Sequence, residues 1–176
     1  MSLTHRTARL SDLPALRALA DAAIAELQRP FLDDAQVAAS ALLMGIDTQL
    51  VEDGTYVVVE EAGEVVGCGG WSRRATLYGG DQSPGRDAAL LDPAVDAARI
   101  RAMYTHPAHT RKGVGRLVLA VCEADAAAEG FRRAELMATL AGEPLYRACG
   151  YDVIERITDD RGGAPVPLLR MGKALA

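Results

Sequence analysis

The stretch Arg101-Ala-Met-Tyr-Thr-His-Pro-Ala-His-Thr-Arg-Lys-Gly-Val-Gly-Arg116 decides the fold of this chain. It starts within a short extended segment, 100–105, turns at His106-Pro107, and passes through a basic loop into an apolar-periodic run over 117–129. That periodicity predicts a helix whose first turn lies at the loop. A glycine-bearing loop that opens a helix is a common anion-binding arrangement, so we expect an anionic ligand here.

The loop is suited to a pyrophosphate. The first N–H groups of a helix lack intrahelical partners, and the helix places about half a positive charge there. Gly113 and Gly115 let the backbone approach a ligand without interference from Cβ atoms. Arg111, Lys112 and Arg116 add three cations within six residues. We therefore interpret this loop as a pyrophosphate cradle.

Length and composition predict one soluble domain spanning 1–176. The chain has 176 residues, 49% of them hydrophobic and 24% charged, which suffices for one well-formed core. Its net charge of −5 argues against nucleic acid or an anionic membrane as the main partner.

The same composition predicts a cytoplasmic protein. No apolar run approaches the ~18 residues of a membrane span. Residues 1–10 carry His5, Arg6 and Arg9 without an apolar core, so we expect no signal peptide.

Cysteine spacing predicts neither disulfides nor a metal site. Cys68, Cys122 and Cys149 are odd in number and form no Cys-x-x-Cys pair. We expect them to be small apolar side chains rather than nucleophiles.

The remaining periodicity predicts an α/β fold with a mixed sheet. Expected strands cover 3–10, 55–60, 65–71, 100–105, 133–139, 152–158 and 165–171, and expected helices cover 12–28, 34–46, 117–129 and 143–148. Gly67, Gly69 and Gly70 weaken one strand, which often marks a bulge or a close approach.

Two segments fit this pattern poorly. Residues 72–95 are rich in glycine and proline and form an irregular insertion, of the kind that is usually functional or mobile. Residues 30–47 suit either a cleft wall or simple packing, and we favour packing.

A second motif lies about 30 residues beyond the cradle. Leu145-Tyr-Arg-Ala-Cys-Gly-Tyr151 follows Ala138-Thr139 and a short predicted helix. Together with the strand, basic loop and helix over 100–129, it resembles the GCN5-related N-acetyltransferase (GNAT) family over nearly the whole chain. The resemblance implies an acyl-CoA N-acyltransferase fold: a mixed, mostly antiparallel sheet of about seven strands flanked by helices.

The resemblance also implies where acetyl-CoA binds. The co-substrate would lie between parallel strands that splay apart, at 100–105 and 133–139. Its pantetheine arm would pair with backbone near Met103, Tyr104 and Thr105. Its pyrophosphate would meet the N–H groups of the loop formed by Arg111, Lys112, Gly113, Val114, Gly115 and Arg116. One departure is visible: the family's usual Gln or Arg three residues before the first glycine is Thr110 here.

The activity that the resemblance implies is acetyl transfer to a primary amine of a small molecule or peptide, by direct attack in a ternary complex. It places the Tyr146 hydroxyl near the CoA sulfur, where a phenol could protonate the departing thiolate. The general base stays open, with four candidates and none favoured: Glu60, Glu61, Asp96 and His106.

Two arginine pairs have alternative interpretations. Arg99 and Arg101 lie on one side of their strand, where they could attract an anionic acceptor or pair with acids on the hairpin strands. Arg73-Arg74, near Trp71, offer the same choice. We favour ion pairs for both. Neutralising Arg99 or Arg101 would raise the acceptor KM only if they face the substrate.

Two other functions compete with the enzyme. Gly113-Val-Gly115 with Glu135 about 20 residues on suggests dinucleotide binding, but the third glycine is missing at Val118 and Glu135 starts its strand instead of ending it. A non-catalytic acyl-CoA sensor on the same fold is the other. The acceptor, the acyl chain length and a homodimer stay open.

Overall fold

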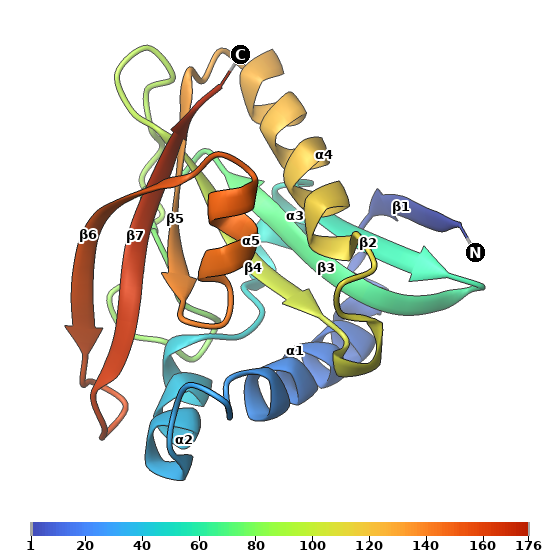
Figure 1. Ribbon diagram of the computed structural model, residues 1–176. Helices are drawn as coiled ribbons and strands as arrows, with labels where there is room; N and C mark the ends of the chain where they lie inside the picture. The colour runs from blue at the N-terminus through green and yellow to red at the C-terminus, as the bar shows by residue number, and fades with distance from the viewer. Residues whose placement is uncertain (1, 176) are drawn as a thin grey trace.

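The computed structural model describes residues 2–175, whose strands form one seven-stranded sheet in the order β1-β2-β3-β4-β5-β7-β6 (Figure 1). The strands are β1 (Leu3–Thr7), β2 (Tyr56–Glu61), β3 (Glu64–Ser72), β4 (Ala98–Thr105), β5 (Arg133–Thr139), β6 (Asp152–Asp159) and β7 (Val166–Ala174). The helices are α1 (Leu13–Leu27), α2 (Asp34–Leu43), α3 (Thr48–Glu52), α4 (Val114–Ala128) and α5 (Glu143–Ala148).

Only the β4–β5 pair is parallel among the strand pairs of the described residues. This confirms the expected mixed, mostly antiparallel sheet. It also departs from a dinucleotide-binding fold, whose sheet is mostly parallel.

The sheet is covered on both faces, as the composition of β2 indicates. Successive side chains of a strand point to opposite faces of the sheet. The side chains of Tyr56, Val57, Val58 and Val59 are nevertheless all buried, so both faces are covered. Val57 and Val59 join the core under α4, whereas Tyr56 and Val58 join the core formed with α1 and α3.

Glycines on β3 bring α4 close to the sheet. A Cβ atom at Gly67 would lie 2.1 Å from Val114 Cγ1, and one at Gly69 would lie 2.6 Å from Val118 Cγ1. Because a valine side chain has little rotational freedom in a helix, neither contact could be relieved cheaply. The close approach expected at these glycines is therefore confirmed, and it sets the position of the α4 N-terminus.

The sheet opens between β4 and β5, where its two halves diverge (Figure 1). Their register contains only two pairs, Ala98 with Ala134 and Arg99 with Glu135. Beyond these pairs, the edge of β4 that faces β5 has no strand partner among the described residues. The expected splay of 100–105 from 133–139 is confirmed.

A β-bulge lies on the other edge of β4. Cys68 pairs with Tyr104 and Gly70 pairs with Arg101, so β4 carries one extra residue there. Ala102 takes it up with a positive φ of 50°, and its carbonyl accepts a hydrogen bond from the buried hydroxyl of Tyr56.

Several predicted boundaries were wrong. Residues 34–46 are helical only to Leu43, and a short helix, α3, follows that was not predicted. Its N-cap is Asp47, whose carboxylate accepts from the Gln49 N–H. A five-residue helix is too short to show periodicity, since such helices depend on packing rather than propensity. The first strand ends at Thr7 because residues 10–12 form a 3-10 turn.

The insertion has no helix or regular strand beyond Ser72, but it is anchored. Gln82 Nε2 donates to the Ala41 carbonyl at 2.8 Å, and the Ser83 hydroxyl donates to the Leu42 carbonyl. These bonds satisfy carbonyls at the C-terminal end of α2 that the helix leaves free. The insertion therefore packs beside 43–45, and both segments face the site.

Candidate active site

A cavity of about 800 Å³ lies where β4 and β5 diverge. It is lined by β4, the loop before α4, the start of α5, the end of α1, and parts of 43–45 and 77–79. Every site residue expected from the sequence lines this cavity except Lys112. Lys112 is exposed within the loop and does not line the cavity, and the roles of all three cations as phosphate ligands stay predictions.

The cradle loop has the conformation of an anion site. Arg111 and Gly113 both have positive φ, 60° and 88°, so the chain turns sharply just before α4 begins at Val114. Turns of this kind direct successive N–H groups toward one point. A Cβ at Gly115 would lie 2.5 Å from Leu145 Cδ2, so this glycine lets α5 pack against the loop. Arg111 and Arg116 line the cavity, and so does the neighbouring Thr110.

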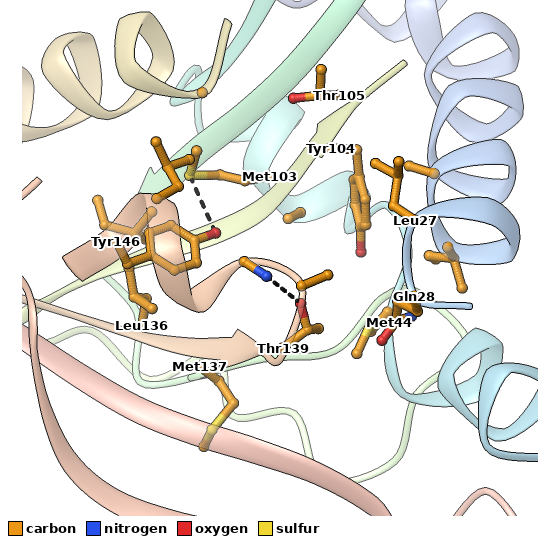
Figure 2. A pocket seen from close by; sticks show the side chains of 18 of the residues that line it. Leu27, Gln28, Met44, Met103, Tyr104, Thr105, Leu136, Met137, Thr139 and Tyr146 are labelled. Carbon is orange, nitrogen blue, oxygen red and sulfur yellow. Dashed lines mark hydrogen bonds between the residues drawn. The ribbon is translucent and has the colours of Figure 1, made fainter. Parts of the chain in front are cut away.

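Tyr146 is held at the mouth of the splay. Its hydroxyl points to Met103 of β4, with the oxygen 3.8 Å from the thioether sulfur (Figure 2). A thioether is a weak acceptor, so this hydroxyl can donate to a better one. Burial, with a smaller effect from the Cys149 thiol, raises the pKa of Tyr146 above its usual range. The phenol therefore stays protonated at neutral pH, as a proton donor must.

Tyr104 lines the same cavity but is engaged elsewhere. Its hydroxyl accepts from the Gly45 N–H at 2.7 Å and donates to the Gly45 carbonyl at 3.3 Å. Its ring therefore spans toward Leu27, Gln28 and Met44, away from Tyr146 (Figure 2). Of these two tyrosines, Tyr146 is the one with a hydroxyl available for chemistry.

None of the four base candidates lines the cavity. Glu60 pairs with Arg6 at 3.0 Å, and Glu61 lies 3.1 Å from His109 Nδ1. Asp96 accepts from the Asp92 N–H, and His106 accepts from the Ala108 N–H as a helix cap. Among residues 2–175, no carboxylate side chain lines the cavity.

His109 is a cavity residue that sequence reasoning missed. It lies in the quoted loop just before the cradle, and the Glu61 carboxylate orients its ring. It therefore sits at the cradle end of the cavity. Its place in the opening motif was the only sequence signal for it.

Arg73, Arg74, Arg99 and Arg101 all form ion pairs, which confirms the favoured alternative. The partners differ from the expected acids on the hairpin strands. Arg99 pairs with Glu135 of β5 at 2.8 Å, and Arg101 pairs with Asp47 at 2.9 Å. The acids on the hairpin strands are not involved in either pair. In the other pair of arginines, Arg73 contacts Glu129 and Arg74 contacts Asp53.

All three cysteines are free thiols. Cys68 and Cys122 are buried, and burial raises the pKa of the Cys68 thiol to about 12. Among residues 2–175, no three metal-ligating side chains cluster. Within the same range, no helix is both long and apolar enough to cross a membrane.

The sequence profile of the acetyltransferase (GNAT) family matches residues 17–151, which is most of the chain. The chain therefore belongs to the GNAT family. The match includes both motifs, the cradle and the Tyr146 segment. A search of curated proteins found no match.

Solved structures share the fold. A GCN5-related N-acetyltransferase from Rhodopseudomonas palustris is 19% identical, with a TM-score of 0.74 over 99% of this chain and 97% of that one. YncA from Salmonella typhimurium, solved with its cofactor acetyl-CoA, is 20% identical, with a TM-score of 0.66 over 100% and 95%. The PaiA N-acetyltransferase from Thermoplasma acidophilum, solved with coenzyme A, is 13% identical, with a TM-score of 0.64 over 99% of each chain.

Proposed function

We propose that this chain transfers an acetyl group from acetyl-CoA to a primary amine of a small molecule or peptide, in a ternary complex and in the cytoplasm. One observation carries the proposal: a single cavity is lined both by the cradle, β4 and Tyr146 and by an apolar wall, here called the apolar compartment, which includes Ile24, Leu27, Phe31, Leu43, Met44 and Leu77. Both substrates can therefore be bound at once, as direct attack requires.

The residues present fit acetyl-CoA. The cradle offers N–H groups and two cations to a pyrophosphate, and backbone near Met103, Tyr104 and Thr105 offers hydrogen bonds to an amide-containing arm. When bound, acetyl-CoA supplies an activated thioester carbonyl. The amine nitrogen forms the new C–N bond as the C–S bond breaks, and no metal is needed in this scheme.

Tyr146 acts on the leaving group. Its hydroxyl proton passes to the departing thiolate, and the proton lost by the attacking amine restores the phenol through solvent. A positioned acid of this kind contributes about 10²–10⁴-fold to the rate. Met103, its present partner, holds the hydroxyl over β4 until a stronger acceptor arrives.

The first prediction tests this role. Tyr146→Phe should lower kcat by about 100-fold or more, the low end of the range for acid catalysis, and leave CoA affinity unchanged. Free-thiol release from acetyl-CoA measures kcat across a panel of amines, amino acids, polyamines, aminoglycosides and peptides, and calorimetry measures CoA binding.

Tyr151→Phe is the matched control. The Tyr151 hydroxyl contacts Glu123 at 2.9 Å and lies outside the cavity, so this change should leave kcat intact. CoA binding without thiol release for any amine would favour the non-catalytic acyl-CoA sensor instead.

A further inference from the structure

We propose that the apolar compartment selects a weakly basic primary amine on an apolar body, and that the Gln28 amide binds a neutral polar group of that acceptor. This inference rests on the proposed transferase function and specifies its second substrate. Three features of the cavity support it: its apolar wall, its lack of carboxylates, and the poorly bonded amide of Gln28.

One wall of the cavity is apolar. Its side chains come from the end of α1, the end of α2 and the insertion, and include Ile24, Leu27, Phe31, Leu43, Met44 and Leu77. Phe31 is 50% exposed, so an aromatic face is open to a ligand. Burying an apolar group of an acceptor against this wall would contribute about 0.8 kcal/mol per methylene.

The charges that face this space are positive or absent. The cavity-lining residues with charged or titratable side chains are Tyr78, Arg101, Tyr104, His109, Arg111, Arg116 and Tyr146. The nearby carboxylate of Asp47 is buried and already accepts from Arg101 and Arg86. A polyamine or a lysine side chain would therefore enter without a counter-ion, which is costly.

The lack of a candidate general base in the cavity points to the same class of acceptor, a weakly basic amine. An amine with a pKa near ~10.4 costs roughly 4–5 kcal/mol to deprotonate at pH 7, whereas an α-amine near ~7.8 costs about 1 kcal/mol. A site whose described lining has no carboxylate therefore suits the weakly basic α-amine. The α-amine of an amino-acid amide or peptide has this low basicity.

Gln28 supplies polar recognition within the apolar wall. Its side chain lines the cavity although the residue is only 5% exposed, and within the described part of the chain its Nε2 has only Met44 Sδ as a partner, at 3.8 Å. Figure 2 shows Gln28 beside Met44, across from Tyr104. A buried amide with so weak a partner gains from a ligand that can both accept and donate. A carbonyl or amide group on the acceptor meets this need.

The test compares matched amines in the thiol-release assay with the full chain. Phenylalaninamide has a weakly basic amine, an apolar body and an amide; glycinamide lacks the apolar body; phenethylamine lacks both the amide and the weak basicity that the amide confers; and spermidine is a polycation. We expect kcat/KM for phenylalaninamide to exceed that for glycinamide by about 10- to 100-fold, as burial of an aromatic side chain predicts. Spermidine should be the poorest substrate.

Two variants test the role of the Gln28 side chain in acceptor selection. Gln28→Leu should lower kcat/KM for phenylalaninamide by about 5- to 10-fold, the loss of one hydrogen bond, and leave phenethylamine unchanged. Gln28→Glu should raise kcat/KM for spermidine because it adds a carboxylate to the wall. Gln36→Glu is the control: it makes the same charge change outside the cavity, where glutamate keeps the acceptor of the α2 capping box and loses only the amide donor to the Pro165 carbonyl.

The outcomes separate the two proposals. A higher kcat/KM for spermidine than for phenylalaninamide would overturn this inference and leave the transferase function supported. So would an equal fall in kcat/KM for phenylalaninamide and phenethylamine in Gln28→Leu. Binding of phenylalaninamide and spermidine to the chain is also measured by NMR saturation transfer. Selective binding of phenylalaninamide without any turnover would support the compartment and overturn the transferase.

Discussion

Arg111 and Arg116 line the cavity, whereas the cation between them in sequence, Lys112, does not. The backbone turn with positive φ at Arg111 and Gly113 explains this difference, because it directs neighbouring side chains apart. At the scale of single residues, the three cations of the cradle are therefore not equivalent.

Neutralising each cation should show the difference. Arg116→Gln should weaken CoA binding by about tenfold, the loss of one charge-assisted hydrogen bond, and Lys112→Gln by clearly less. Calorimetry at low and high salt measures both, and the Arg116 effect should shrink with added salt. Equal losses for the two variants would contradict this placement.

The opening between β4 and β5 is held at its base by a cluster of charges. Glu135, which is 5% exposed, accepts from Arg99 at 2.8 Å and from Arg170 at 2.6 Å. These bonds join β4, β5 and β7 at the last paired position before the strands diverge. At the scale of elements, this cluster sets where the cleft between β4 and β5 begins.

Glu135→Gln should destabilise the fold by about 3 kcal/mol, because it leaves two arginines without their shared counter-charge. Glu129→Gln, which breaks the more exposed pair with Arg73, should cost less than about 1 kcal/mol. Urea unfolding measures both variants. Similar losses would mean that the Glu135 cluster is no more important than a surface pair.

At the scale of the whole molecule, both edges of the sheet are fastened by a carboxylate and an arginine. Arg6 hydrogen-bonds Asp12 near β1 and holds the pKa of that carboxyl down at about 2. At the other edge, Arg161 does the same for Asp159 of β6, whose pKa is also lowered to about 2.

These carboxylates predict an acid-sensitive fold. Because the folded-state pKa values lie below the ordinary value of 3.8, their stabilisation is complete above about pH 4 and is lost as the pH falls to about 2. The urea midpoint should therefore drop over this range. Asp12→Asn and Asp159→Asn should each flatten that drop, and an unchanged profile in both variants would rule out these groups as its cause.

Most elements could be predicted from the sequence, because their signals are local. Periodicity located α1, α4 and the strand β5, and the glycines of β3 correctly predicted a close approach. The short helix α3 could not be predicted, since its stability comes from the Asp47 cap and from packing.

Part of the candidate site could likewise be predicted from local sequence motifs, and part could not. The cradle and Tyr146 are short motifs whose residues are close in the chain, so the sequence alone indicated the family and the residues proposed to bind acetyl-CoA. The acceptor compartment joins α1, the end of α2 and the insertion, which are far apart in sequence. Only the tertiary structure brought Gln28 into that wall and kept the carboxylates of residues 2–175 out of it, because those contacts are made by packing across the sheet and not by any local pattern.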